Sequence, residues 1–156
     1  MNNLSIYQEK ILSLAAENKK VIALKDFNRS FEMRNPMCGD EVKVRLKLVE
    51  TKIIDISAVV RGCALCEASA GLVVELFKNK DVPDEKFLDE FLSWLENTEK
   101  SFSDQLPIEM KVFEPIREIK NRHKCITMPF EATCSSLDIK YNQTINQEIQ
   151  SVSQTK

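Results

Sequence analysis

The residues of this sequence best suited to chemistry are its five cysteines and the acidic residue that lies beside one of them. Cys38 stands two residues before Asp40 in the sequence Met-Cys-Gly-Asp, Cys63 and Cys66 form a Cys-x-x-Cys pair, and Cys125 comes much later in the chain. Zn²⁺ accepts thiolate and carboxylate ligands, and iron also binds thiolates. The sequence therefore offers either a thiol-based metal site or a reactive thiol.

The cysteines are expected to be reduced. Their number is odd, and the N-terminal segment MNNLSIYQEKILSLAAENKK contains no uninterrupted apolar stretch of the signal-peptide type. Disulfide frameworks belong to oxidising compartments, whereas thiols stay reduced in the cytoplasm. We therefore expect a cytoplasmic protein whose thiols are free to bind metal or to react.

The positions of the cysteines relative to predicted helices separate reactive thiols from core residues. Cys63 and Cys125 each directly precede a predicted helix, where the helix dipole and unpaired N–H groups stabilise a thiolate. Cys66 lies almost one turn further along, next to the apolar stripe that includes Leu72, and is more simply interpreted as a small buried residue. Cys134 shares a face with apolar residues and is predicted to lie in the core.

Two common interpretations of a Cys-x-x-Cys pair do not suit this sequence. A zinc ribbon needs a second such pair, which the sequence lacks, and a thioredoxin-like pair needs a parallel βαβ unit. The single histidine, His123, would point to the same side as Cys125 in an extended segment, so ligation stays open. A lone histidine is nevertheless more often an ordinary surface or core residue.

An antiparallel hairpin is the element that must position the first half of this site. Apolar residues alternate with polar ones over 42–48, and a second apolar run covers 53–60. Because a one-residue slip would turn every side chain to the other face, we expect the register that pairs only apolar residues on one face. Its pairs are Val42 with Val60, Val44 with Ala58, Leu46 with Ile56 and Leu48 with Ile54, with Glu50, Thr51 and Lys52 as the loop.

Extending this register to the open end of the hairpin brings two parts of the candidate site together. Cys63 then lies opposite Gly39, between Cys38 and Asp40, and Gly39 is interpreted as the small residue that allows this approach. Addition of Cys125 would complete a set of three sulfur atoms and one oxygen, which suits tetrahedral Zn²⁺. Ferrous iron or an iron–sulfur cluster would accept the same thiolates.

The remaining pattern is mostly helical. Proline is tolerated only in the first turn of the last helix, which restricts Pro129, and Pro115 is expected to bend an earlier one. Residues 139–156 are rich in Gln, Asn and Ser and are expected to form a flexible polar tail. Apolar periodicity predicts a short strand near 31–33 and helices over 5–19, 64–77, 81–97, 106–119 and 126–137.

The overall composition is that of one globular domain. The chain has 156 residues, of which 43% are hydrophobic and 29% charged. Its net charge of −2, without a dense Lys or Arg cluster, argues against nucleic acid as a partner. No apolar segment is long enough to cross a membrane, so no membrane association is expected.

The motifs together resemble a known family. Cys-Gly-Asp, then Gly-Cys at the end of a hairpin and the start of a helix, then Arg-x-Lys-Cys before the last helix resemble the U-type iron–sulfur assembly proteins: SufU, IscU and the N-terminal domain of NifU. The match covers residues 31–137. The long separation of Cys63 from Cys125, and Lys124 before Cys125, are most similar to the SufU branch.

This resemblance implies a fold, a function and a site. The fold would be an α+β domain over 1–138, with a small antiparallel three-stranded sheet packed on one side by helices and the polar tail 139–156 after it. The protein would receive persulfide sulfur from a cysteine desulfurase and serve downstream iron–sulfur assembly or recipient proteins. The implied zinc ligands are Cys38, Asp40, Cys63 and Cys125.

The resemblance also implies individual roles. Cys38 would be the sulfur acceptor, and in a true scaffold Cys38, Cys63 and Cys125 would hold the iron–sulfur cluster. The same ligand set serves zinc-dependent transfer and cluster scaffolding, so both remain open. Cys66 stands where the family commonly has another residue, and the Leu-Pro-Pro-Val-Lys motif is missing, so no chaperone partner is expected.

Two other functions fit the same residues. A thiol redox protein would use the Cys63 and Cys66 pair, and a structural zinc module would hold metal only to support protein contacts. The first requires catalytic dependence on that pair without metal, and the second requires tight zinc binding without any sulfur acceptance.

Overall fold

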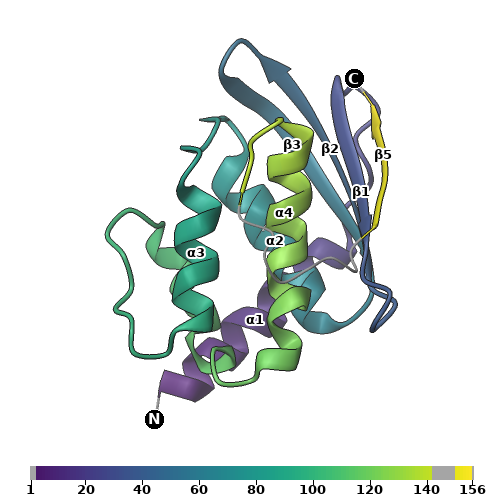
Figure 1. Cartoon of the computed structure of the whole chain (residues 1–156). Coiled ribbons are helices and arrows are strands. Elements are labelled where there is room, and N and C mark those ends of the chain that lie inside the picture. The colour runs from purple at the N-terminus through teal and green to yellow at the C-terminus, as the bar shows by residue number, and fades with distance from the viewer. Residues whose placement is uncertain (1–2, 142–149, 156) are drawn as a thin grey trace.

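The computed structural model describes residues 3–141 and 150–155, and it has a sheet on one side and helices on the other (Figure 1). The elements in chain order are α1 (Asn3–Lys19), β1 (Arg29–Arg34), β2 (Glu41–Val49), β3 (Lys52–Arg61), α2 (Ala64–Phe77), β4 (Lys80–Asp81), α3 (Phe87–Glu96), the 3₁₀ segments η1 (Ile108–Ile116) and η2 (Lys120–Arg122), α4 (His123–Ser136) and β5 (Gln150–Thr155).

The sheet is antiparallel throughout and has the strand order β4-β3-β2-β1-β5. The α+β class with an antiparallel sheet is confirmed, but the expected number of three strands is wrong. The three predicted strands form the centre, and β4 and β5 add to its two edges. Sequence pattern could not find these edges, because β4 has only two residues and β5 lies in a polar segment without apolar alternation.

The predicted hairpin register is confirmed from its open end as far as Lys47, which pairs with Asp55. Beyond this point a β-bulge shifts the pairing, so that Leu48 faces Ile53 and the prediction of Ile54 is wrong. The loop is correspondingly shorter, with Glu50 at φ 57° and Lys52 already in β3. The bulge buries Ile53 completely and leaves Ile54 42% exposed, so the inward position passes to Ile53.

The helices cover one face of the sheet, as expected. α2 contacts β3 and packs against α1 and α4, while α4 lies across β1 and β2 (Figure 1). α2 has the predicted bounds, because its apolar stripe starts directly after the hairpin. α3 begins at Phe87 rather than near residue 81, because Lys80 and Asp81 join the sheet.

Two predictions about proline-containing helices are wrong. Segment 106–119 forms the 3₁₀ helix η1 over Ile108–Ile116, with Pro115 inside it, instead of an α-helix. α4 begins at His123, three residues earlier than predicted, so Pro129 lies in its interior and not in its first turn. Proline has no N–H, and the carbonyl of Cys125 therefore lacks its usual partner four residues later. Tight packing of α4 overrides this local cost, since Met128 and Phe130 on either side of the proline are completely buried.

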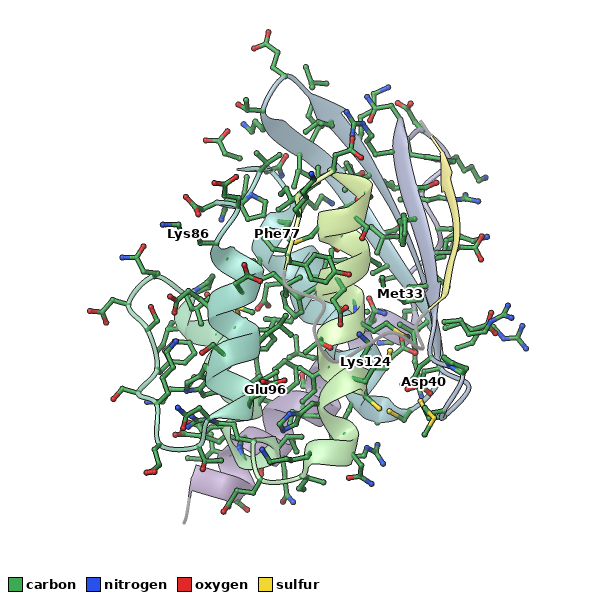
Figure 2. All side chains as sticks on the ribbon, viewed as in Figure 1. Met33, Asp40, Phe77, Lys86, Glu96 and Lys124 are labelled. Carbon is green, nitrogen blue, oxygen red and sulfur yellow. The ribbon has the colours of Figure 1, made fainter. Side chains whose placement is uncertain are left out.

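The core between α2, α3 and α4 is aromatic. Ring centroids of Phe77, Phe87, Phe91 and Phe130 lie 5.4–6.2 Å apart in tilted and edge-on contacts, and Figure 2 shows Phe77 between the helices. Buried Arg117 donates to backbone carbonyls around the end of α3 and stacks on Trp94. This arrangement fixes the connection between α3 and α4.

The C-terminal segment is only partly described. Residues 139–141 follow α4 and 150–155 form β5, whereas 142–149 and 156 lie outside the described residues. The boundary at residue 138 and the flexibility of the tail stay predictions. Within the described ranges, no helix is both long and apolar enough to span a bilayer.

Candidate metal centre

The loop between β1 and β2 closes on itself and presents Cys38 and Asp40. The Asn35 N–H donates to the Asp40 carbonyl at 2.8 Å, and the Gly39 N–H donates to the Asn35 carbonyl at 2.7 Å. The Asn35 side-chain oxygen accepts from the N–H of Met37 at 3.0 Å, which is a typical asparagine turn. This compact loop leaves Cys38 exposed and buries Asp40 to 5% exposure.

Two glycines shape this end of the sheet in different ways. The expectation that Gly39 provides space is wrong, since a Cβ there would meet nothing within 4 Å. Gly39 instead has φ +80°, a left-handed conformation that glycine adopts without strain. Gly62 provides the space, because a Cβ at this position would lie 2.6 Å from Asp40 Cγ. The closeness of Gly62 to Asp40 depends on the conformation of the loop between β1 and β2, so the sequence did not predict it.

Cys63 lies against Asp40, as the hairpin register predicts. It is the N-cap residue of α2, with extended backbone at φ −78° and ψ 167°. Its N–H donates to Asp40 Oδ1 at 3.3 Å, and its thiol donates to Oδ2 at 3.4 Å. Both oxygens of the carboxylate are therefore directed toward the start of α2.

Cys125 approaches from α4 and completes the cluster. The Cys38 sulfur, an Asp40 carboxylate oxygen and the Cys125 sulfur all lie within 4.8 Å of one another. Cys63 is outside this mutually close set of three but contacts Asp40 and hydrogen-bonds Cys125. Figure 2 shows Asp40 at the lower end of the sheet, where several sulfur atoms gather. The structure thus brings all four predicted ligands to one place.

The pKa values of the thiols of Cys63 and Cys125 are shifted in opposite directions. The hydrogen bond from Cys125 is the largest cause that lowers the pKa of Cys63, to about 6, and the Cys66 N–H lowers it further. The same hydrogen bond, followed by burial, raises the pKa of Cys125. Of these two thiols, Cys63 is therefore the one that ionises first, with Cys125 donating to it, and on ionising it gives up its own donation to Asp40.

Arg122 is a further residue of the cluster. Its guanidinium faces the sulfurs of Cys63 and Cys125, which raise the pKa of Arg122. Its Nε is buried without a hydrogen-bond partner in the described part of the chain. The sequence identified Arg122 only as part of the Arg-x-Lys-Cys segment. No local pattern predicts that its guanidinium lies beside the thiol of Cys63, which belongs to a distant segment.

The cluster suits a metal ion on its chemistry. Asp40 is a nearly buried carboxylate, and no lysine or arginine among the described residues forms an ion pair with it. A buried charge needs compensation, and a cation held by the carboxylate and neighbouring thiolates would supply it. Three sulfurs and one oxygen match the donor types that tetrahedral Zn²⁺ accepts.

The remaining cysteines and the histidine lie outside this cluster. Cys66 and Cys134 are 0% and 1% exposed, in agreement with their predicted core positions, and burial raises the pKa of Cys134 to about 12. Burial also raises the pKa of Cys66. His123 Nε2 lies 3.1 Å from the Ile116 carbonyl and 2.9 Å from that of Arg117. Carbonyls only accept, so this nitrogen carries a proton and links η1 to α4.

A buried ion pair lies on either side of Cys125 in α4. Lys124 contacts Glu131, with side-chain exposures of 12% and 3%, and Thr127 donates to the same carboxylate at 2.7 Å. Burial lowers the pKa of Lys124, while Glu131 opposes this shift. The pair fixes the first two turns of α4 and thereby the helix that holds Cys125.

Comparison with known sequences identifies relatives of this chain. Residues 6–91 match the model of the NifU-like N terminal domain. The zinc-dependent sulfurtransferase SufU of Bacillus subtilis is 24% identical over 65% of this chain and 69% of its own length. The iron–sulfur cluster assembly scaffold protein IscU of Streptococcus pyogenes is 24% identical, and the chain spans 64% of that relative. IscU of Thermotoga maritima is 26% identical over 85% of this chain and 92% of its own length.

Solved structures support the same fold. A SufU chain from Fervidobacterium islandicum superposes with a TM-score of 0.67 at 24% identity, covering 87% of this chain and 99% of that one. The N-terminal part of a NifU-like protein from Brucella abortus gives a TM-score of 0.64 at 24% identity, covering 85% of this chain and 92% of that one. Because the family model matches more than half of the sequence, this chain belongs to the family of the NifU-like N-terminal domain.

Proposed function

We propose that this protein accepts sulfur for iron–sulfur cluster assembly, with Cys38 as the acceptor and a metal held by Cys38, Asp40, Cys63 and Cys125. The observation that carries the proposal is the approach of Cys38, Asp40 and Cys125 within 4.8 Å, with Cys63 against Asp40. Its relatives are named as a zinc-dependent sulfurtransferase and as cluster scaffolds. The sulfur donor would be a cysteine desulfurase.

Exposure favours Cys38 as the acceptor. It is the exposed cysteine of the cluster, whereas Cys63 is half-buried and Cys125 is buried. In the transfer step, the Cys38 thiolate attacks the outer sulfur of a persulfide on the donor. The donor's S–S bond breaks, the donor cysteine leaves as a thiolate, and Cys38 becomes a persulfide. A bound metal would keep the cluster thiols deprotonated.

The chain's own residues prepare this step. Asp40 holds Cys63 through two contacts, so the rigid part of the site stays in place when Cys38 moves. Arg122 places a positive charge beside Cys63 and Cys125, which offsets part of the charge of the thiolates. The loop that carries Cys38 can therefore release one ligand without loss of the others.

Zinc is the metal we propose for the resting protein. The donor set of thiolates with one carboxylate suits zinc, and the relative from B. subtilis is named zinc-dependent. An iron–sulfur cluster on Cys38, Cys63 and Cys125 would be the product state of a scaffold. Elemental analysis of freshly purified protein separates the two, since zinc without sulfide supports transfer and iron with sulfide supports scaffolding.

The test combines metal analysis with mass spectrometry. The purified protein is mixed with a cysteine desulfurase and cysteine, and the peptide that carries Cys38 is expected to gain one sulfur atom. Cys38→Ala should remove this gain, and Asp40→Ala should lower the metal content. Cys134→Ala replaces a buried cysteine outside the cluster and should change neither result.

Two outcomes would reject the proposal. Tight zinc binding without sulfur on Cys38 would indicate a structural zinc module. Activity that depends only on Cys63 and Cys66, in protein without metal, would indicate a thiol redox protein.

A further inference from the structure

The Cys63 and Cys66 pair has a second feature that the proposed metal site does not use. Cys63 is the N-cap residue of α2, and Cys66 is its third helical residue. Side chains of a helix are tilted toward its N-terminus, and a residue at this third position commonly reaches back to the N-cap. The Cys66 N–H already faces the Cys63 sulfur. Both cysteines are therefore directed toward the same end of α2.

This spacing allows a disulfide with a small adjustment at the start of the helix. Residues three apart on a helix have Cβ atoms about 5–6 Å apart, whereas a disulfide needs them roughly 3.5–4.5 Å apart. Cys63 is the N-cap residue and has an extended backbone, so this adjustment falls on a residue outside the helix. Both cysteines are free thiols in the structure, and the pair can form a disulfide while the rest of α2 stays in place.

The two thiols differ in what they can reach. Cys63 is half-buried and borders Asp40, the residue that also contacts the Cys38 region. Cys66 is 0% exposed, so no external thiol or persulfide can approach it. The sulfur that it can attack is one carried by its neighbour Cys63.

We propose that Cys66 is a resolving thiol that releases, as sulfide, the sulfur first accepted by Cys38. This inference rests on the proposed function, because it needs a persulfide on Cys38. It assigns to Cys66 a chemical role in place of a purely structural one, and it makes the protein a source of sulfide as well as a sulfur carrier.

The reaction has two balanced steps. In the first, the Cys63 thiolate attacks the outer sulfur of the Cys38 persulfide, the S–S bond breaks, and Cys38 leaves as a thiolate. In the second, the Cys66 sulfur attacks the Cys63 sulfur that is bonded to carbon. The outer sulfur departs with the Cys66 proton and its own proton as H₂S, and a Cys63–Cys66 disulfide remains.

The electrons balance within the protein. The outer sulfur is reduced by two electrons to sulfide, and the two cysteines are oxidised by two electrons to the disulfide. One sulfide is therefore released per chain, and an external dithiol would reduce the disulfide before a second turnover. The disulfide also removes Cys63 from the proposed ligand set, so any metal bound there should be weakened at the same moment.

The test loads the purified protein with inorganic polysulfide, removes the excess, and follows sulfide release and peptide masses without reductant. We expect one sulfide per persulfide lost, and a peptide spanning Cys63 and Cys66 that has lost two hydrogens. Cys66→Ala should slow sulfide release about tenfold or more, because an intramolecular attack is lost. Cys134→Ala, which removes another buried thiol, should behave like the unmodified protein.

Three outcomes would overturn the inference: a persulfide that persists in the unmodified protein, equal release by Cys66→Ala, or a disulfide that joins Cys63 to Cys125 instead. The product disulfide in the unmodified protein tests the inference even if Cys66→Ala folds poorly. Polysulfide loading also separates the two proposals. Sulfide release from polysulfide-loaded protein, combined with no transfer from a desulfurase, would reject the proposed function and retain the role of Cys66.

Discussion

Asp40 connects the parts of the candidate site at the scale of single residues. It is 5% exposed, contacts the N–H and the thiol of Cys63, and lies in the same set of ligand atoms as Cys38 and Cys125. Gly62 leaves just enough space for this carboxylate. The position of Asp40 therefore depends on a residue that has no chemistry of its own.

Replacement of the two glycines by alanine should have different effects. Gly62→Ala should displace Asp40 and reduce the metal content, because the new Cβ would overlap the carboxylate. Gly39→Ala should cost about 1 kcal/mol of stability from its left-handed backbone, yet leave space for Asp40. Elemental analysis and denaturant unfolding of both variants check this. Full metal content in Gly62→Ala would contradict the role of Gly62.

The reactivity of Cys63 should depend on pH in a distinctive way. Its pKa is lowered to about 6, chiefly by the hydrogen bond from Cys125, so in metal-free protein its thiolate is present above that pH and is lost as pH falls through it. Alkylation of Cys63, followed by peptide mass spectrometry, should therefore level off near neutral pH. Cys125→Ala should move the midpoint upward. An unchanged midpoint in this variant would contradict the proposed hydrogen bond.

Helix α4 determines the placement of Cys125 at the scale of elements. It begins earlier than its apolar pattern suggests and continues through Pro129, because its neighbours on the sheet and on α2 bury it. Lys124 and Glu131 join its first two turns inside the protein. Lys124 of the ion pair and Cys125 of the candidate site are thus adjacent residues of one helix.

Removal of one partner of this pair should destabilise the protein strongly. Glu131→Ala would leave the Lys124 ammonium buried without its carboxylate and should cost about 3 kcal/mol in denaturant unfolding. The double variant Lys124→Met with Glu131→Gln removes the charge and retains an acceptor for Thr127, so it should recover much of this loss. Glu17→Ala breaks an exposed pair with Lys20 and should have no measurable effect. Equal loss in the double variant would contradict this account.

At the scale of the whole molecule, three separate segments contribute residues to the candidate site. The β1–β2 loop brings Cys38 and Asp40, the end of β3 brings Cys63, and α4 brings Cys125. The core extends between the sheet and the helices and consists mostly of apolar and aromatic side chains, with Cys125 among its residues and Cys63 packed against it. The fold therefore does not depend on the metal for its core.

Removal of metal should accordingly lower stability without unfolding the protein. A ligand that binds only the folded state stabilises it by about 2.7 kcal/mol at a concentration 100 times its Kd. Chelator treatment should lower the melting temperature by several degrees and leave the far-ultraviolet circular dichroism unchanged. Asp40→Ala should melt at the same temperature with or without chelator. Complete unfolding on chelation would show that the metal is needed for folding.

Local patterns in the sequence determined most of the central fold. Alternation defined β2, an apolar run defined β3, and their pairing set the register up to Lys47, because burial of one face penalises any slip. The apolar stripe likewise defined α2. From this register the closeness of Cys63 to Asp40 followed, so half of the candidate site was predictable from the chain alone.

Tertiary structure decided the remainder, because it depends on contacts between distant segments. The edge strands β4 and β5, the bulge at Ile54 and the early start of α4 arise from packing that no local pattern records. The position of Arg122 beside two thiols and the space at Gly62 depend on elements far apart in sequence. The sequence thus determined the types of the candidate ligands. The fold decided which side chains surround them and where space is left for them.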